Sequence, residues 1–85
     1  MKTFKLKVTS PDGDDFSGDA IMLVVRGVEG ELAVMADHVP FVTAVKACTV
    51  KIETEDEDIY ADIGGGMLSV SKTETLLLSS SFTRK

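Results

Sequence analysis

The fold is decided by residues 49–63, which read TVKIETEDEDIYADI. Val50 and Ile52 fall on one face of an extended segment, and the polar residues between and after them fall on the other. This two-residue period is typical of a half-buried strand. The alternation returns over residues 59–63, after an acidic tip at residues 55–58. Two alternating runs joined by a short polar tip predict an antiparallel hairpin.

Strands are also predicted on both sides of this hairpin. Residues 3–10 alternate polar and apolar side chains, and residues 20–26 form an apolar run too short for a helix, which we interpret as a strand buried on both faces. Shorter strands are predicted at 32–35, 41–46, 67–71 and 75–80, between turn signals at 11–14, 17–19, 27–30 and 64–66. Eight to ten such strands imply an all-β fold, an antiparallel β-sandwich or flattened barrel.

The apolar residues that face inward in this pattern form the expected core. They are Phe4, Leu6, Val8, Leu23, Val25, Leu32, Val34, Val50, Ile52, Ile63, Leu68, Val70 and Leu77. A chain of this size buries only about 63% of its unfolded surface, so its stability is modest, about 5 kcal/mol. We therefore expect the domain to be supported by its packing or by a partner.

Length, charge and cysteine content limit what the chain can do. Its 85 residues make one domain, residues 1–85, and its net charge is −5. That charge disfavours nucleic acid and anionic membranes as ligands and favours a basic or neutral protein surface. Cys48 is the only cysteine, so no internal disulfide can form. Because no apolar run approaches the roughly 18 residues needed to cross a bilayer, no membrane insertion is expected.

The sequence offers little catalytic, metal-binding or cofactor-binding chemistry. Nucleophilic catalysis by a cysteine–histidine pair would need His38, the only histidine, to activate Cys48, the only cysteine. Residues 12–15 begin like a calcium loop, but Phe16 occupies the next ligand position. Gly64-Gly65-Gly66 precedes a strand instead of the helix that a phosphate site needs, so we expect it to permit a bulge or a close approach of two backbones. We expect no enzyme activity, no metal and no cofactor.

Two polar loops flank the predicted strand at 32–35. One is Glu29-Gly30-Glu31-Leu32 and the other is Asp37-His38-Val39-Pro40. Periodicity does not decide whether both lie at the same end of the sandwich. By its chemistry alone, His38 is either a local turn residue or a partner contact.

The same loops carry a resemblance to a known family. Residues 29–41, EGELAVMADHVPF, resemble the segment E-G-E-L-G-I-L-P-G-H-x-P-L of the epsilon subunit of F-type ATP synthases, which is called delta in mitochondria. Residues 3–13 look like the first strand and turn of that subunit, residues 16–18 like its F-x-G step, and residues 63–70 like its S-G-G-x-L-x-V motif. The likeness runs in order along nearly the whole chain.

The resemblance implies a ten-stranded β-sandwich and a non-catalytic role in the central stalk. The sandwich would dock on the gamma subunit and on the c ring, at the cytoplasmic face of the membrane, and couple proton or sodium flow to ATP synthesis. The acidic loop at Glu29 and Glu31 and the loop at His38 would be the partner contacts, with Glu31 and His38 facing the c ring. An arginine in a polar loop of the ring would pair with Glu31.

The sequence also departs from the family pattern. Ala33 replaces the usual glycine, Gly64 replaces the usual serine, and Ala36-Asp37 replace the usual Pro-Gly, so we expect a different turn before His38. Family members usually continue into two helices after the last strand, and we expect this chain, which stops at Lys85, to lack that helical hairpin. The alternative to a stalk subunit is a divergent stand-alone β-sandwich, an adaptor or a small-ligand-binding module.

Overall fold

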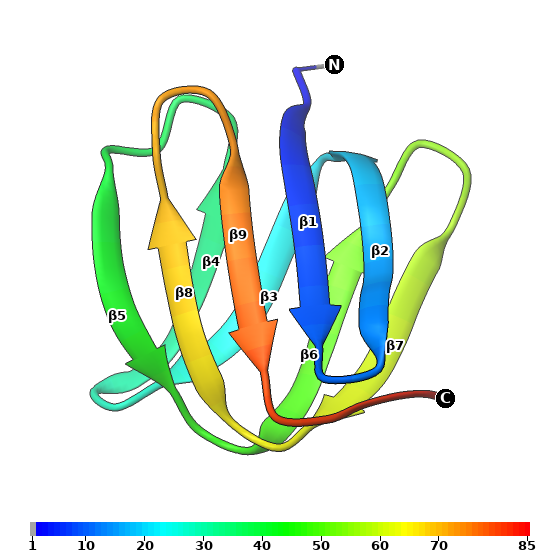
Figure 1. Cartoon of the computed structure of the whole chain (residues 1–85). Helices are drawn as coiled ribbons and strands as arrows, with labels where there is room; N and C mark the ends of the chain where they lie inside the picture. The colour runs from blue at the N-terminus through cyan, green and yellow to red at the C-terminus, as the bar shows by residue number, and fades with distance from the viewer. Residues whose placement is uncertain (1) are drawn as a thin grey trace.

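The computed structural model describes residues 2–85 and consists of ten strands (Figure 1). Their bounds are β1 Phe4–Ser10, β2 Gly13–Ala20, β3 Met22–Gly27, β4 Gly30–Met35, β5 Phe41–Val45, β6 Cys48–Glu53, β7 Asp58–Ile63, β8 Gly66–Val70, β9 Thr75–Ser79 and β10 Phe82–Arg84. This confirms the all-β fold and the ten strands that the resemblance implies.

The strands form two layers that face each other across the core. One layer has the order β5-β8-β9-β1-β2, and the other has β10-β7-β6-β3 with β4 paired on the far side of β3 (Figure 1). A single bridge between Gly27 and Val45 joins β3 to β5, so the layers make a nearly closed, flattened barrel. All pairs are antiparallel except β1 with β9, which corrects the expectation of a wholly antiparallel sheet.

The hairpin predicted from residues 49–63 is formed by β6 and β7. Val50 pairs with Ala61 and Ile52 with Ile59, and all four side chains are buried because they share the inward face. Thr54 closes the acidic tip, because its Oγ1 accepts a hydrogen bond of 3.0 Å from the Glu57 N–H. The two-residue period therefore located both the strands and the face that enters the core.

The core is close to the expected one. All the predicted core residues are buried except Phe4 and Leu32, which are partly buried and pack against it. Ala20, Val45, Ile59 and Ala61 are buried as well. The core therefore draws side chains from both layers, as a sandwich requires.

The triple glycine brings two backbones together, as predicted. A Cβ added at Gly66 would overlap the carbonyl oxygen of Leu78, and it would lie 2.8 Å from the Leu78 carbonyl carbon and 3.0 Å from the Ser79 Cα. Gly66 pairs with Ser79 at the start of the β8–β9 ladder. Only glycine allows the two strands this approach.

Two local predictions were wrong, and one strand was not predicted. Residues 17–19 do not turn but lie within the edge strand β2, whose outward polar residues imitate a turn signal. The strand at 20–26 is not buried on both faces, because Met22 and Val24 are half-buried and Arg26 is exposed on its outer face. The strand β10 was not predicted, because its three residues are too few to show a period.

Candidate partner-docking site

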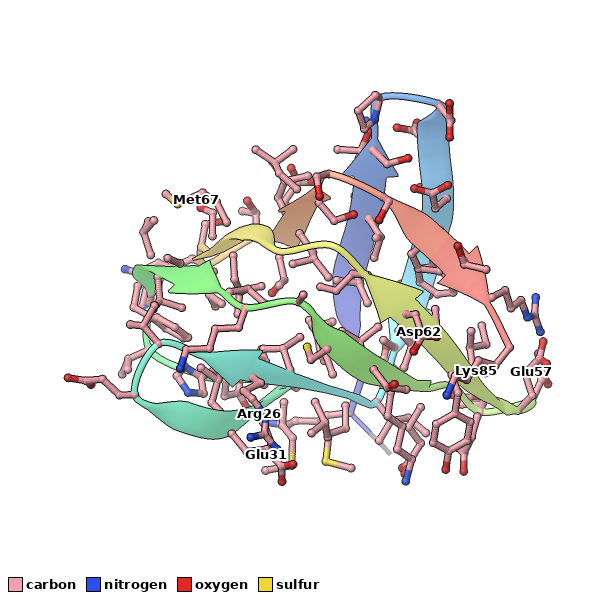
Figure 2. The ribbon with its side chains drawn as sticks, turned by 90° about the horizontal axis from the view of Figure 1, so that it is seen from below. Arg26, Glu31, Glu57, Asp62, Met67 and Lys85 are labelled. Carbon is pink, nitrogen blue, oxygen red and sulfur yellow. The ribbon has the colours of Figure 1, made fainter. Side chains whose placement is uncertain are left out.

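The first of the two polar loops is the tip of the β3–β4 hairpin. Val28 and Glu29 form the turn, and Gly30, with φ of 129°, takes a conformation that side-chain-bearing residues rarely adopt. Glu31, the second residue of β4, lies directly opposite Arg26, and Figure 2 shows these two side chains next to each other outside the sheet. Neither Glu29 nor Glu31 forms an ion pair with another residue of the range 2–85. This end of the sandwich therefore exposes two carboxylates, with the Arg26 side chain beside that of Glu31.

The second loop positions His38 by a tight turn. The His38 N–H donates to the Met35 carbonyl over 3.2 Å, and Asp37 has φ of 68°, the positive value at the third position of a type II turn. Proline at the second position and glycine at the third favour a type II turn, and here Ala36 and Asp37 occupy those two positions.

The His38 ring is half-buried and held locally. Its Nδ1 donates a hydrogen bond of 2.8 Å to the Val39 carbonyl, and its ring centroid lies 4.9 Å from that of Phe41. Asp37, beside it, pairs with the Lys2 ammonium at 2.7 Å. This hydrogen-bonded ion pair raises the pKa of Lys2 and ties the N-terminal segment to the turn.

The two loops lie at opposite ends of the molecule. Strand β4 runs from the hairpin tip at one end to the His38 turn at the other (Figure 1). Six residues at about 3.3 Å each separate the loops by about 20 Å. Glu29 and Glu31 therefore share one surface, and His38 belongs to another.

An apolar strip covers the outer face of β5, β8 and β9. Val42, Met67 and Leu78 are 62%, 46% and 45% exposed, and Met67 pairs across the strands with both Ala44 and Leu78. In Figure 2 Met67 lies on the opposite side of the molecule from Arg26 and Glu31. The sequence reading missed this strip, although Val42 and Leu78 each neighbour an inward-facing residue and so fall on the outer face by the two-residue period.

The arrangement of His38 and Cys48 excludes a catalytic pair. His38 precedes β5 and Cys48 begins β6, so the length of β5 separates them. Within residues 2–85 no group of three or more His, Cys, Asp or Glu side chains is placed to hold a metal ion. The same residues contain no helix that is long and apolar enough to cross a membrane.

The ten-stranded sandwich thus carries an acidic hairpin tip and an apolar outer strip. The model of the family described as ATP synthase, Delta/Epsilon chain, beta-sandwich domain matches residues 3–85, and the chain belongs to that family.

Two relatives agree with this assignment. The chain is 38% identical over 79 residues to an ATP synthase epsilon chain, sodium ion specific, of Propionigenium modestum, covering 93% of this chain and 58% of that one. It is 36% identical to a protein of the same description from Acetobacterium woodii, covering 92% of this chain and 59% of that one. It thus spans about three fifths of the length of these relatives.

The fold recurs in solved mitochondrial assemblies. A chain of the Euglena gracilis mitochondrial ATP synthase, from a structure of OSCP/F1/c-ring, aligns with a TM-score of 0.90 at 20% identity, covering 96% of this chain and 53% of that one. A chain of the Tetrahymena thermophila central stalk/c-ring structure aligns with a TM-score of 0.82 at 12% identity, covering 95% and 66%. At these identities the likeness concerns the fold alone.

Proposed function

We propose that this chain is a non-catalytic central-stalk subunit of a proton- or sodium-translocating F-type ATP synthase. It docks on the gamma subunit and the c ring at the cytoplasmic face of the membrane and helps couple ion flow to ATP synthesis. The observation that carries the proposal is the family match over residues 3–85, combined with an exposed acidic hairpin tip and an exposed apolar strip on separate faces of the sandwich.

The acidic hairpin tip is assigned to the c ring. Glu29 and Glu31 are exposed and free of ion pairs within residues 2–85, so they can pair with basic groups of a polar loop. Val28, 55% exposed at the same tip, adds an apolar contact. Charge pairs of this kind contribute more to the orientation of the two surfaces than to the binding affinity.

The apolar strip is assigned to the gamma subunit. Val42, Met67 and Leu78 offer the apolar area that the centre of a protein interface requires. His38 lies at the opposite end of β4 from Glu29 and Glu31, and its ring contacts Phe41, the first residue of the strand that carries Val42. We therefore place His38 at the gamma subunit instead of at the ring.

Two matched pairs of variants test the assignment. Glu31→Gln should weaken association with the isolated c ring about tenfold, while Glu55→Gln, at the acidic tip of the β6–β7 hairpin, should leave it unchanged. Met67→Asp should weaken binding to the gamma subunit by about tenfold or more, while Tyr60→Asp, equally exposed on the other layer, should not. Titration calorimetry measures both. Failure of the wild-type chain to bind gamma at tens of micromolar would refute the stalk role and favour a stand-alone adaptor.

A further inference from the structure

Strand β4 has a free edge. It pairs with β3 along all six of its residues and with no other strand of the region 2–85 (Figure 1). An unpaired edge presents a row of backbone N–H and C=O groups that another strand can bind.

The register shows which backbone groups point outward. Opposed residues of an antiparallel pair exchange either both hydrogen bonds or neither, in alternation. The Arg26 carbonyl accepts a bond of 2.9 Å from the Lys46 N–H, so it points away from β4, and the pair Arg26 with Glu31 is a non-bonded one. By alternation, the N–H groups of Glu31, Ala33 and Met35 point to the free edge.

The carbonyls follow the same alternation. Those of Glu31 and Ala33 point outward, and the Met35 carbonyl does too, since it accepts the hydrogen bond from the His38 N–H. The edge thus offers three outward N–H donors and two open carbonyl acceptors in a regular row.

Other edges of the sandwich are protected against strand addition. In β2, Val8 pairs with Phe16 and Thr9 with Asp14, which leaves Asp15 as a bulge in an acidic strand. The last strand, β10, has three residues and carries Arg84. Strand β4 lacks a bulge, a proline and a lysine, the usual devices that block pairing.

The surroundings of β4 define the chemistry of an added strand. A groove of about 440 Å³ lies between residues 27–32 of the β3–β4 hairpin and residues 41–43 of β5, and Leu32 and Phe41 line it. Beside the outward edge, Ala33 and Met35 are exposed, Met35 by 54%. These features favour apolar side chains on an incoming strand.

Charge selects both the partner and its direction. Glu29 and Glu31 stand unpaired at the start of β4, so a basic side chain fits there. We propose that the free edge of β4 binds an extended segment of another protein that pairs antiparallel, carries apolar residues, and places Lys or Arg toward its C-terminal end, beside Glu31. A second copy of this chain is a poor occupant, because its net charge of −5 and its own Glu29 and Glu31 would repel the carboxylates beside β4.

A synthetic peptide tests this binding mode apart from the stalk assignment, because it needs neither the gamma subunit nor the c ring. The probe has about eight residues, alternates Val and Thr, and ends in Lys-Lys. Two matched peptides carry either N-methyl groups on the backbone edge that faces β4 or Glu-Glu in place of Lys-Lys. On the protein, Ala33→Pro removes one outward N–H without breaking a bond to β3, and Ala33→Ser keeps that N–H.

The probe should bind the wild type and the serine variant with Kd of about 100 μM and protect the amides of Glu31, Ala33 and Met35 from hydrogen exchange. It should bind the proline variant at least about tenfold more weakly, and the N-methylated and acidic peptides should also bind about tenfold more weakly. The N-methylated peptide keeps the test valid should the proline variant unfold. The proposal would be overturned if the probe did not bind, or if the N-methylated peptide bound equally well. It would also be overturned if the protected amides lay in β2 or β5, or if the chain dimerised through β4.

Discussion

Replacement of Gly66 by alanine should destabilise the sandwich strongly. The added Cβ would overlap the Leu78 carbonyl oxygen and would lie 3.0 Å from the Ser79 Cα, and both obstacles are backbone atoms that cannot rotate away. Strand β8 would therefore have to separate from β9 at the pairs Gly66 with Ser79 and Met67 with Leu78.

The expected loss follows from this separation. Two ladder hydrogen bonds contribute about 1 kcal/mol each, and a buried backbone group left without a partner costs about 1 kcal/mol or more. The sum, about 3 kcal/mol, is more than half of the roughly 5 kcal/mol expected for a domain of this size. The variant should populate the unfolded state at denaturant concentrations that leave the wild type folded.

Urea unfolding followed by circular dichroism measures the effect. With an m-value of about 1 kcal/mol per molar, the midpoint should fall by about 3 M. Gly18→Ala is the matched control, because a Cβ there meets only the Phe16 Cζ, at 3.8 Å, and the change should stay within about 0.5 kcal/mol. A midpoint for Gly66→Ala within about 0.5 M of the wild type would show that the close approach of β8 and β9 is not required.

Three further outcomes are expected. Leu68→Ala removes a fully buried side chain and should lower the free energy of unfolding by about 3 kcal/mol in the same urea assay. Asp37→Ala should lower it by about 1 kcal/mol and Asp37→Asn by less than about 0.5 kcal/mol, because asparagine tolerates the positive φ and alanine does not; equal effects would contradict this. Asp37 raises the pKa of Lys2, so this exposed ion pair should add a small stabilisation below the usual lysine pKa of 10.5. The stabilisation should be lost as the pH rises through the raised pKa of Lys2. Thermal unfolding of the wild type and of Asp37→Asn across this pH range measures the difference.

The sequence predicted the parts of the fold that depend on neighbouring residues. The period of two placed Val50 and Ile52 on the inward face, because alternation along a strand is a local property. It missed β10, whose three residues are too few to alternate, and the parallel pairing of β1 with β9. That pairing joins residues 6–9 to residues 75–78, and no local pattern records such a contact.

The residues proposed for docking illustrate the same limit. The sequence showed that Glu31 and His38 are polar residues beside an apolar strand. It did not show that β4 places them at opposite ends of the molecule. The apolar strip was missed because Leu76, Leu77 and Leu78 read as one apolar run, of which only Leu77 is fully buried. Which residue of such a run faces out depends on its register with β8.

The separation of the two surfaces has a consequence for assembly. The tip of the β3–β4 hairpin, which carries Glu29 and Glu31, lies about 20 Å from the His38 turn at the other end of β4. A partner bound at one end therefore leaves the other end open. Residues so far apart with no shared partner contribute independently to binding. Between them, β4 is hydrogen-bonded to β3 along its whole length, so the two ends keep a fixed spacing. A sandwich of modest stability can thus hold two partners at a defined distance, as the proposed place between the c ring and the gamma subunit requires.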